Sequence, residues 1–210
     1  KNVGMGAALN IGCVFLMGLG FTHALLLDQD SDIEDNLPSV LFDYITKNSN
    51  VGIVGPRISL VGDGIKPLRV DYGGFVVASS KFIFKRTLLG RVPLEVAFNI
   101  TSGSMIDLSV HHDVGGFWEE LFIDGVDTEF CLRIKDFGFS TVVLPEVTLN
   151  QRYGEFSGTK RFLGFSFNPT HHNEQRKYIS FRNQVMICKR HFRNHGYYVA
   201  WQLMSSIKAF

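Results

Sequence analysis

A run of apolar residues that ends in alternating carboxylates is the feature that most constrains the fold of this chain. Residues 24–27 are apolar without interruption, and Asp28, Asp30 and Asp32 follow at alternate positions. The run is typical of a strand covered on both faces, and ligands of open α/β sheets bind beyond the carboxyl ends of strands. Carboxylates there suit Mg²⁺ or Mn²⁺ shared with substrate phosphates. A solvated acidic turn or helix cap is the alternative interpretation.

The segments around this strand alternate between helical and extended patterns. We expect helices at 6–17, 37–47, from about Met105, 126–137, 175–192 and 198–210, with strands at 23–27, 51–54, 74–86, 98–101, 141–144 and 147–149. Gly55-Pro56 should end the second strand, and 57–72 has a loop-like composition. This alternation predicts an α/β domain with a mixed, mainly parallel central sheet over residues 1–170. Residues 171–210 should form a helical extension packed on it.

Composition excludes several classes of protein. Hydrophobic residues make up 45% of the 210 residues and charged residues 20%, which argues against disorder. A net charge of +1 gives no global field for nucleic acid. Three cysteines far apart in sequence predict neither a disulfide framework nor a zinc ribbon and fit a reducing cytoplasm. Polar residues and glycines interrupt the apolar stretch 7–27, so we expect a helix and a strand there rather than a membrane span.

A second acidic cluster opens the helix expected at 126–137. Asp124 and Asp127 lie at its start, where the positive end of the helix dipole favours ionised carboxylates. An ionised carboxylate can accept a proton from an attacking hydroxyl. Glu129 and Arg133 are four residues apart and can pair on one helix face. The alternative is a capped helix with a surface ion pair.

Taken together, the motifs resemble those of the family 2 inverting glycosyltransferases, within the bacterial rhamnosyltransferase branch. The resemblance spans nearly the whole chain and depends on the order and spacing of its motifs: Asn2-x-Gly4, Asn10-x-Gly12, Leu26-Leu27-Asp28-Gln29-Asp30-Ser31, Ser102-Gly103-Ser104, Gly115-Gly116-Phe117, Phe122-Ile123-Asp124-Gly125-Val126-Asp127-Thr128-Glu129-Phe130-Cys131-Leu132-Arg133, Arg176-Lys177-Tyr178 and Phe181-Arg182-Asn183.

The resemblance implies a GT-A fold, a Rossmann-like α/β domain that uses a metal-bound sugar nucleotide. This chain begins at Lys1, about one strand–helix–strand segment late, so we expect the N-terminal part of the fold to be missing from it. Asp28 and Asp30 would form the DxD motif that holds Mg²⁺ or Mn²⁺, and Asp127 would be the catalytic base, with Asp124 as the alternative. The residues assigned to the donor are Asn2, Gly4, Asn10, Asp28 and Gln29.

The residues assigned to the acceptor or sugar cleft are Ser102, Gly103, Trp118, Glu129 and Arg133. Ser102-Gly103-Ser104 should open the helix expected from Met105 and present backbone N–H groups to a ligand. Two positions depart from the family pattern. Trp118-Glu119 replaces Asp-Glu after Gly-Gly-Phe, and its aromatic ring offers a face on which a sugar can stack. Gln151 stands where a histidine is frequent, so His171, His172 or Arg182 are candidates for phosphate or metal contacts.

The function implied by the resemblance is transfer of L-rhamnose from dTDP-L-rhamnose, with inversion, to a saccharide or lipid-linked acceptor in cell-surface polysaccharide synthesis. A different donor such as a UDP-hexose, or a non-catalytic carbohydrate-binding domain, are the alternatives. A dehydrogenase is disfavoured because no strand precedes Gly4. A glycoside hydrolase would leave the acidic strand end unexplained.

The C-terminal region combines basic and aromatic residues, which suits an anionic bilayer surface. Peripheral attachment to the cytoplasmic face would bring the cleft to a lipid-linked acceptor. Packing on the domain or on a second subunit of a homo-oligomer is the alternative. In the same region His191 and His195 are one helical turn apart, but no third metal ligand lies near them in sequence, so we expect structural or solvent-facing roles for both.

Overall fold

The computed structural model of the chain describes residues 2–29, 31–62, 65–69, 92–152, 160–162, 165–167, 174–200 and 202. The helices are α1 (Met5–Gly18), α2 (Leu37–Lys47), α3 (Leu108–Asp113), η1 (Glu119–Leu121), α4 (Val126–Asp136) and α5 (Glu174–His191). The strands are β1 (His23–Leu25), β2 (Ser31–Ile33), β3 (Val51–Gly62), β4 (Ile65–Arg69), β5 (Leu94–Val96), β6 (Met105–Asp107), β7 (Ser140–Arg152), β8 (Lys160–Phe162) and β9 (Phe165–Phe167).

The central sheet is mixed, as expected. Its strand order is β1-β6-β3-β7-β2, with β4 paired to β3 and β5 to β7. Within the described part of the chain, the long β3–β7 ladder is parallel and the other strand pairs are antiparallel. The parallel share is therefore smaller than predicted. The short flanking strands run antiparallel to β3 or β7. An antiparallel neighbour can follow a short turn, whereas a parallel neighbour requires a long crossover connection.

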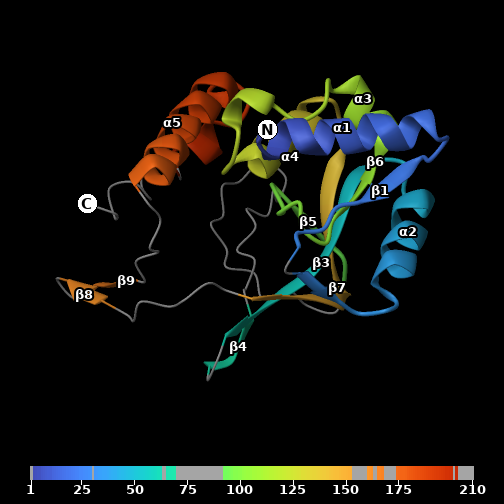
Figure 1. The fold of residues 1–210 in the computed structure, drawn as a ribbon, viewed down its shortest axis with the longest axis horizontal. Helices are drawn as coiled ribbons and strands as arrows, with labels where there is room; N and C mark the ends of the chain where they lie inside the picture. The colour runs from blue at the N-terminus through green and yellow to red at the C-terminus, as the bar shows by residue number, and fades with distance from the viewer. Residues whose placement is uncertain are drawn as a thin grey trace.

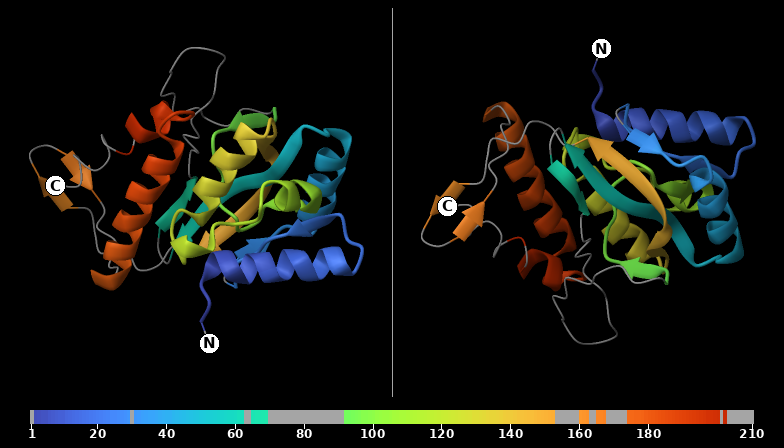
Figure 2. Two further views of the ribbon diagram at one scale, coloured as in Figure 1. Left: turned by 90° about the horizontal axis from the view of Figure 1, so that it is seen from above. Right: turned by 90° about the horizontal axis from the view of Figure 1, so that it is seen from below.

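Helices cover both faces of this sheet (Figure 1). Alternate strand residues face opposite layers: Ile53 packs with the helices α1, α3 and α4, whereas Val54 packs against α2. In β6, Ile106 packs in the core with α1, α3 and α4, and Met105 packs in the core with α2. The two views of Figure 2 show α1 and α4 on one side of the sheet and α5 beside α4. The strand predicted at 23–27 is shorter, since β1 ends at Leu25 and lies at the edge of the sheet. The prediction that both faces of this run are covered is wrong, because only Ala24 of β1 is buried and Leu27 is 48% exposed.

β3 does not end at Gly55-Pro56, contrary to the prediction, but continues to Gly62 and pairs with β4. Gly55 is needed because a Cβ there would lie 2.0 Å from Nδ2 of Asn99. The register between β3 and β7 shifts at Pro56/Arg57, where Leu144 and then Thr148 are the partners. This irregularity accommodates both Pro56 and Pro145, so 141–144 and 147–149 belong to the single strand β7. Residues 57–62 and 65–69 are extended rather than a loop.

The helix expected from Met105 begins later, after a strand. Met105–Asp107 is β6, and Asp107 then caps α3 by accepting hydrogen bonds from the N–H groups of Ser109 (2.8 Å) and Val110 (3.4 Å). The predicted strand 98–101 is a loop, and the strand of this region is β5. The expected strands at 74–86 lie outside the described residues. Residues 196–200 and 202 are helical, and the rest of the helix expected at 198–210 also lies outside them.

The helices α1, α2, α4 and α5 confirm the predicted ones to within a residue or two at each end. α5 packs on α4: Ile187 is buried in the same apolar core as Phe130 and Ile134. No helix in the described residues has the length and apolar character needed to cross a membrane.

Candidate active site

The acidic end of β1 is joined to the turn at 101–104 by hydrogen bonds. The N–H of Gly103 donates to the carbonyl of Leu26 at 2.7 Å, and the N–H of Asp28 donates to Ser102 Oγ at 3.2 Å. Ser31 Oγ lies 2.5 Å from the same Ser102 hydroxyl. Asp28 and Gln29 are exposed, and Asp30 lies outside the described residues. Ser102 and Gly103 thus lie next to the predicted metal-binding segment, although they precede a strand rather than a helix.

Asn99 is the residue of this region that sequence patterns did not reveal. Its side chain is 2% exposed. Its Nδ2 donates to Ser104 Oγ at 3.1 Å, whereas its Oδ1 has no hydrogen-bond partner within the described residues. A buried acceptor without a partner costs free energy unless a water or ligand satisfies it. Asn99 therefore presents a free acceptor at the pocket described next. The strand predicted at 98–101 gave no indication that Asn99 would line a pocket.

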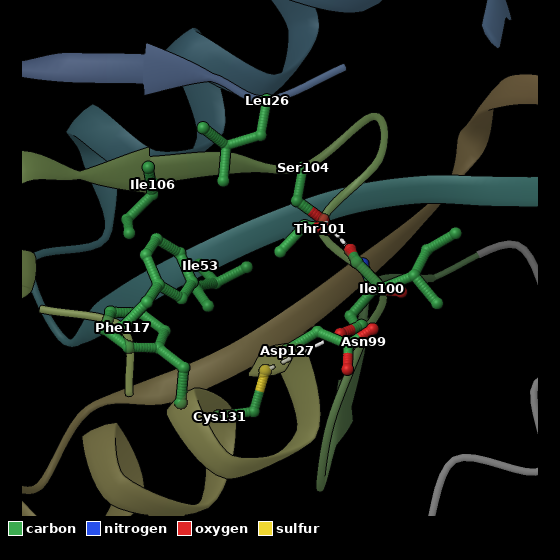
Figure 3. A pocket seen from close by; sticks show the side chains of 11 residues that line it. Leu26, Ile53, Asn99, Ile100, Thr101, Ser104, Ile106, Phe117, Asp127 and Cys131 are labelled. Atoms are coloured by element: carbon green, nitrogen blue, oxygen red, sulfur yellow. Dashed lines mark hydrogen bonds between the residues drawn. The ribbon is translucent and has the colours of Figure 1, made fainter. Parts of the chain in front are cut away.

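One pocket lies between Leu26, which follows β1, and Asp127 of the second acidic cluster. Leu26 at the end of β1, Thr101 and Ser104 of the turn, Asn99, and Asp127 of α4 all line it (Figure 3). Its free volume is about 10 Å³, which is roughly the space that one water molecule needs. It is far too small for a sugar ring. The pocket is therefore the inner end of the candidate site, and a sugar would have to bind outside it.

Asp127 is the second residue of α4, with its carboxylate at the helix N-terminus. Oδ1 accepts hydrogen bonds from the backbone N–H of Thr128 at 2.7 Å and from Thr128 Oγ1 at 3.4 Å. Burial raises the pKa of the Asp127 carboxyl above its ordinary value; the hydrogen bonds from Thr128 oppose this, and the charge of Asp124 adds to it. A carboxylate with a raised pKa binds a proton more strongly, which suits a general base.

Asp124 has a different environment from Asp127. Its two carboxylate oxygens pair with Arg176 of α5 at 3.2 Å and 2.9 Å, in a bidentate ion pair. Because a guanidinium holds both oxygens, Asp124 is the poorer candidate for proton transfer. Its backbone is in the left-handed region, with φ 54°, which aspartate tolerates better than most residues.

α5 also holds the backbone of the loop that leads into Asp127. Nδ2 of Asn183 donates to the carbonyls of Leu121 (2.7 Å), Ile123 (2.5 Å) and Asp124 (2.8 Å). Arg182, predicted as a phosphate or metal contact, donates to Glu120 O at 2.8 Å and to Asn183 Oδ1. The Phe181-Arg182-Asn183 motif thus positions the loop before Asp127. His171 and His172 lie outside the described residues.

Glu129 and Arg133 form an ion pair inside the protein rather than at a sugar cleft. Glu129 is 0% exposed. Its oxygens accept from Arg133 Nε (3.0 Å) and Nη2 (2.7 Å), and His191 (3.3 Å) and Arg190 (3.4 Å) approach Oε1. Arg133 also donates to the carbonyl of Val114 at 2.6 Å. This burial corrects both the predicted sugar contact and the alternative of a surface ion pair, because these groups are already fully occupied.

Three residues predicted to bind the donor make structural contacts around α1. Asn2 Oδ1 accepts from the N–H of Gly4, whose φ of 86° and close approach to Phe122 require glycine. Asn10 donates to Phe117 O and Glu119 Oε1 and accepts from His111 and the N–H of Phe117. The contacts of Asn10 fix α1 against the loop 115–122, whereas a Cβ at Gly12 would meet no other atom among the described residues.

Trp118 is partly buried beside α5. The guanidinium carbon of Arg190 lies 4.5 Å from the centre of its ring, so a cation–π contact covers one face. A sugar could stack only on the other face. The tryptophan that replaces the family's acidic residue therefore joins η1 to α5.

Comparisons with known proteins address the class of this fold. No protein-family model matches the chain. The dTDP-rhamnosyl transferase RfbF of Shigella flexneri is 28% identical over 192 residues, which cover 90% of this chain and 61% of the relative. The crystal structure of GalNAc-T7 with UDP, GalNAc and Mn²⁺ matches with a TM-score of 0.60 and 14% identity, covering 93% of this chain and 36% of that one.

The fold is thus that of the GT-A glycosyltransferases, as the sequence motifs predicted. Together, the sequence relative and the structural match support a glycosyltransferase family for this chain. The chain spans about three fifths of the length of its curated relative.

Proposed function

We propose that this chain is the catalytic part of a nucleotide-sugar-dependent glycosyltransferase. The observation that carries the proposal is the pocket at which the end of β1 and the start of α4 meet, with Leu26 and Asp127 in its lining. A sugar nucleotide needs an electropositive or metal-neutralised place for its diphosphate, and the acceptor hydroxyl needs a base. The acidic strand end and Asp127 supply these two requirements on adjacent elements.

In the proposed reaction, the acceptor hydroxyl attacks the anomeric carbon of the donor while Asp127 takes its proton. The bond from the anomeric carbon to the diphosphate oxygen breaks, and the nucleoside diphosphate leaves. A single displacement inverts the configuration at the anomeric carbon. Asp28 and Asp30 offer the carboxylate oxygens that Mg²⁺ or Mn²⁺ prefers, and the hydrogen bonds that Ser102 makes with Asp28 N–H and Ser31 fix the backbone around them. When bound, such a cation neutralises charge on the departing diphosphate.

The donor we propose is dTDP-L-rhamnose, with a saccharide or lipid-linked saccharide as acceptor. The support is the name of the 28% identical relative, a dTDP-rhamnosyl transferase, together with the Asp-Gln-Asp-Ser and Phe-Ile-Asp-x-Val-Asp motifs. The structural neighbour was solved with UDP and GalNAc, so a UDP-hexose is the competing donor.

Donor hydrolysis by the full-length protein, measured over a panel of sugar nucleotides with Mg²⁺ or Mn²⁺, tests this proposal. We expect release of dTDP from dTDP-L-rhamnose, abolished by EDTA and restored by excess metal. Preference for a UDP-sugar would reject rhamnose and keep the reaction class. Donor or glycan binding without turnover, under all metal conditions, would instead identify a carbohydrate-binding domain.

We further propose that residues 171–210 are a helical extension whose outer side contacts an anionic bilayer. On α5 the exposed large apolar residues fall at helical spacing and are Tyr178, Phe181 and Val185, and the exposed Phe192 follows the helix directly. Lys177, Lys189 and Arg193 are exposed near them. The apolar stripe could enter the interface of a membrane, and the flanking cations would be attracted to anionic lipid headgroups.

Co-sedimentation with vesicles tests this contact. We expect the protein to bind vesicles that contain phosphatidylserine at low salt, and binding to weaken with added salt. Phe181→Ser with Phe192→Ser should lower the bound fraction several-fold, whereas Phe137→Ser, at an exposed phenylalanine after α4, should not. Absence of binding together with a dimer in solution would assign the stripe to a subunit interface.

A further inference from the structure

We propose that Asp136, His191 and His195 bind a zinc ion that joins the C-terminal end of α4 to the C-terminal end of α5. This site is separate from the proposed Mg²⁺ or Mn²⁺ site at the end of β1 and does not depend on the proposed function. Sequence spacing gave two histidines without a third ligand. The fold supplies the third, since Asp136 ends the helix that α5 packs against.

The distances between the candidate ligand atoms match a zinc site before the ion enters. One ligand atom from each of the three residues lies within 4.8 Å of the others. Asp136 Oδ1 lies 3.0 Å from His195 Nε2, and Oδ2 lies 3.7 Å from His191 Nδ1. Zinc bonds of 2.0–2.1 Å in a tetrahedron place neighbouring ligand atoms about 3.3 Å apart. The two distances fall on either side of this value, so small side-chain movements suffice.

Each histidine uses its other ring nitrogen in the manner of a metal ligand. His191 Nε2 lies 3.3 Å from Glu129 Oε1, and His195 Nδ1 lies 3.0 Å from the hydroxyl of Tyr197. Histidines that bind metals almost always hydrogen-bond a carboxylate or another acceptor through the second nitrogen, which fixes the ring. Both rings are buried, at 3% exposure, and are held in place before any metal binds.

The chemistry of the three ligands selects the metal. Two imidazoles and one carboxylate suit zinc, whereas Mg²⁺ takes oxygen ligands almost entirely. A water molecule would take the fourth position, because Asp136 is exposed.

The site would link two parts of the protein that matter for Asp127. α5 holds the loop 121–125 through Asn183 and Arg176, and its opposite end carries His191. His191 also contacts the buried Glu129. Zinc at this place would fix α5 along its length against α4, and its effect on activity would be indirect.

Zinc content and cobalt spectroscopy of the full-length protein test the proposal. We expect one Zn²⁺ per chain after dialysis, and a tetrahedral Co²⁺ absorption spectrum when Co²⁺ replaces it. Zn²⁺ at about a hundred times its Kd should raise Tm by roughly 5–10 °C relative to EDTA-treated protein. Asp136→Asn and His195→Asn should each remove the cobalt spectrum and the rise in Tm.

Two controls make the result specific. His112→Asn removes an exposed histidine outside the cluster and should leave the cobalt spectrum unchanged. Asp30→Asn changes the proposed catalytic metal site and should also leave it unchanged. If circular dichroism shows a folded His195→Asn protein that binds Co²⁺ like wild type, or if wild type binds no Zn²⁺, the three residues form only hydrogen bonds. These readouts are independent of sugar transfer, so loss of the proposed activity would not affect them.

Discussion

Replacement of Asp127 by asparagine is expected to lower kcat by about 10²–10⁴-fold, the usual contribution of a general base. Asparagine has the same shape, and its Oδ1 can still accept the hydrogen bond that Thr128 N–H donates at 2.7 Å. It cannot take the proton of the acceptor hydroxyl. Donor binding should be preserved, because the acidic end of β1 is unchanged. Single-turnover transfer and donor titration on the full-length protein measure the two effects separately.

The matched control is Asp124→Asn, three residues earlier on the same loop. Asp124 is paired with Arg176, so its replacement should weaken the attachment of α5 and have a smaller effect on kcat. If Asp127→Asn turns over like wild type while Asp124→Asn is inactive, the base is Asp124 and the assignment is wrong. Equal and large losses would instead indicate that both changes disturb the loop.

The raised pKa of Asp127 predicts opposite effects on activity and on stability. The base must be ionised, so kcat/KM should fall as the pH drops through a value above the ordinary aspartate pKa of about 3.9. A folded-state pKa above the unfolded one means that the folded protein binds the proton more tightly. Stability therefore declines as pH rises through that window, and the ionised carboxylate is unfavourable at neutral pH. Asp127→Asn should accordingly raise Tm at pH 7 while it removes activity.

Glu129→Gln is expected to destabilise the protein by about 3–5 kcal/mol, the usual cost of removing one partner from a buried ion pair. The side chain is 0% exposed, and its carboxylate is the shared partner of Arg133, His191 and Arg190. Glutamine keeps the shape but presents an N–H₂ group to donors. Urea unfolding followed by circular dichroism measures the free energy of unfolding.

Asp43→Asn is the control, since Asp43 and Lys47 form an exposed ion pair with the same spacing of four residues. Its removal should cost no more than about 0.5 kcal/mol. Burial alone would raise the pKa of Glu129, but the hydrogen bonds of His191 and Arg133 hold it below its ordinary value. The stabilisation is therefore present above the unfolded pKa of about 4.3 and is lost as pH falls through the lower folded value. A Glu129→Gln protein as stable as wild type would show that the network contributes nothing.

Local patterns predicted the elements that carry a strong periodic signal. α1, α2, α4 and α5 were found from apolar spacing, from Pro38 in the first turn of α2 and from Gly138 after α4. β3 was cut short because Gly55-Pro56 is a local stop signal, which the parallel pairing with β7 overrides. The strand β6 was missed because pairing with β1 and β3, both distant in sequence, decides the conformation of 105–107.

Sequence patterns proposed the charged residues of the candidate site, but they did not reveal the residues that hold these in place. Asp28 and Asp127 lie at a strand end and a helix start, places that sequence marks locally. Glu129 was assigned to the sugar cleft, with a surface ion pair as the alternative, because spacing gives no measure of burial. In the folded chain, His191 of α5 contacts its carboxylate. Asn99 had no local signal, since its importance comes from the neighbouring Gly55 and the pocket. The burial of Glu129 and the position of Asn99 both depend on contacts between segments that are distant in sequence, and local patterns do not report such contacts.

The three hydrogen bonds from Asn183 to the loop 121–125 have a consequence for the synthesis of the protein. A ribosome adds Asn183 well after Asp127, and β7, a strand of the central sheet, emerges in between. A nascent chain can therefore bury much of its core while the backbone ahead of Asp127 still lacks these three hydrogen bonds. The loop before Asp127 would then gain this support only after α5 has emerged and docked. A chain halted before α5 would hold the sheet without the contacts that position the proposed base.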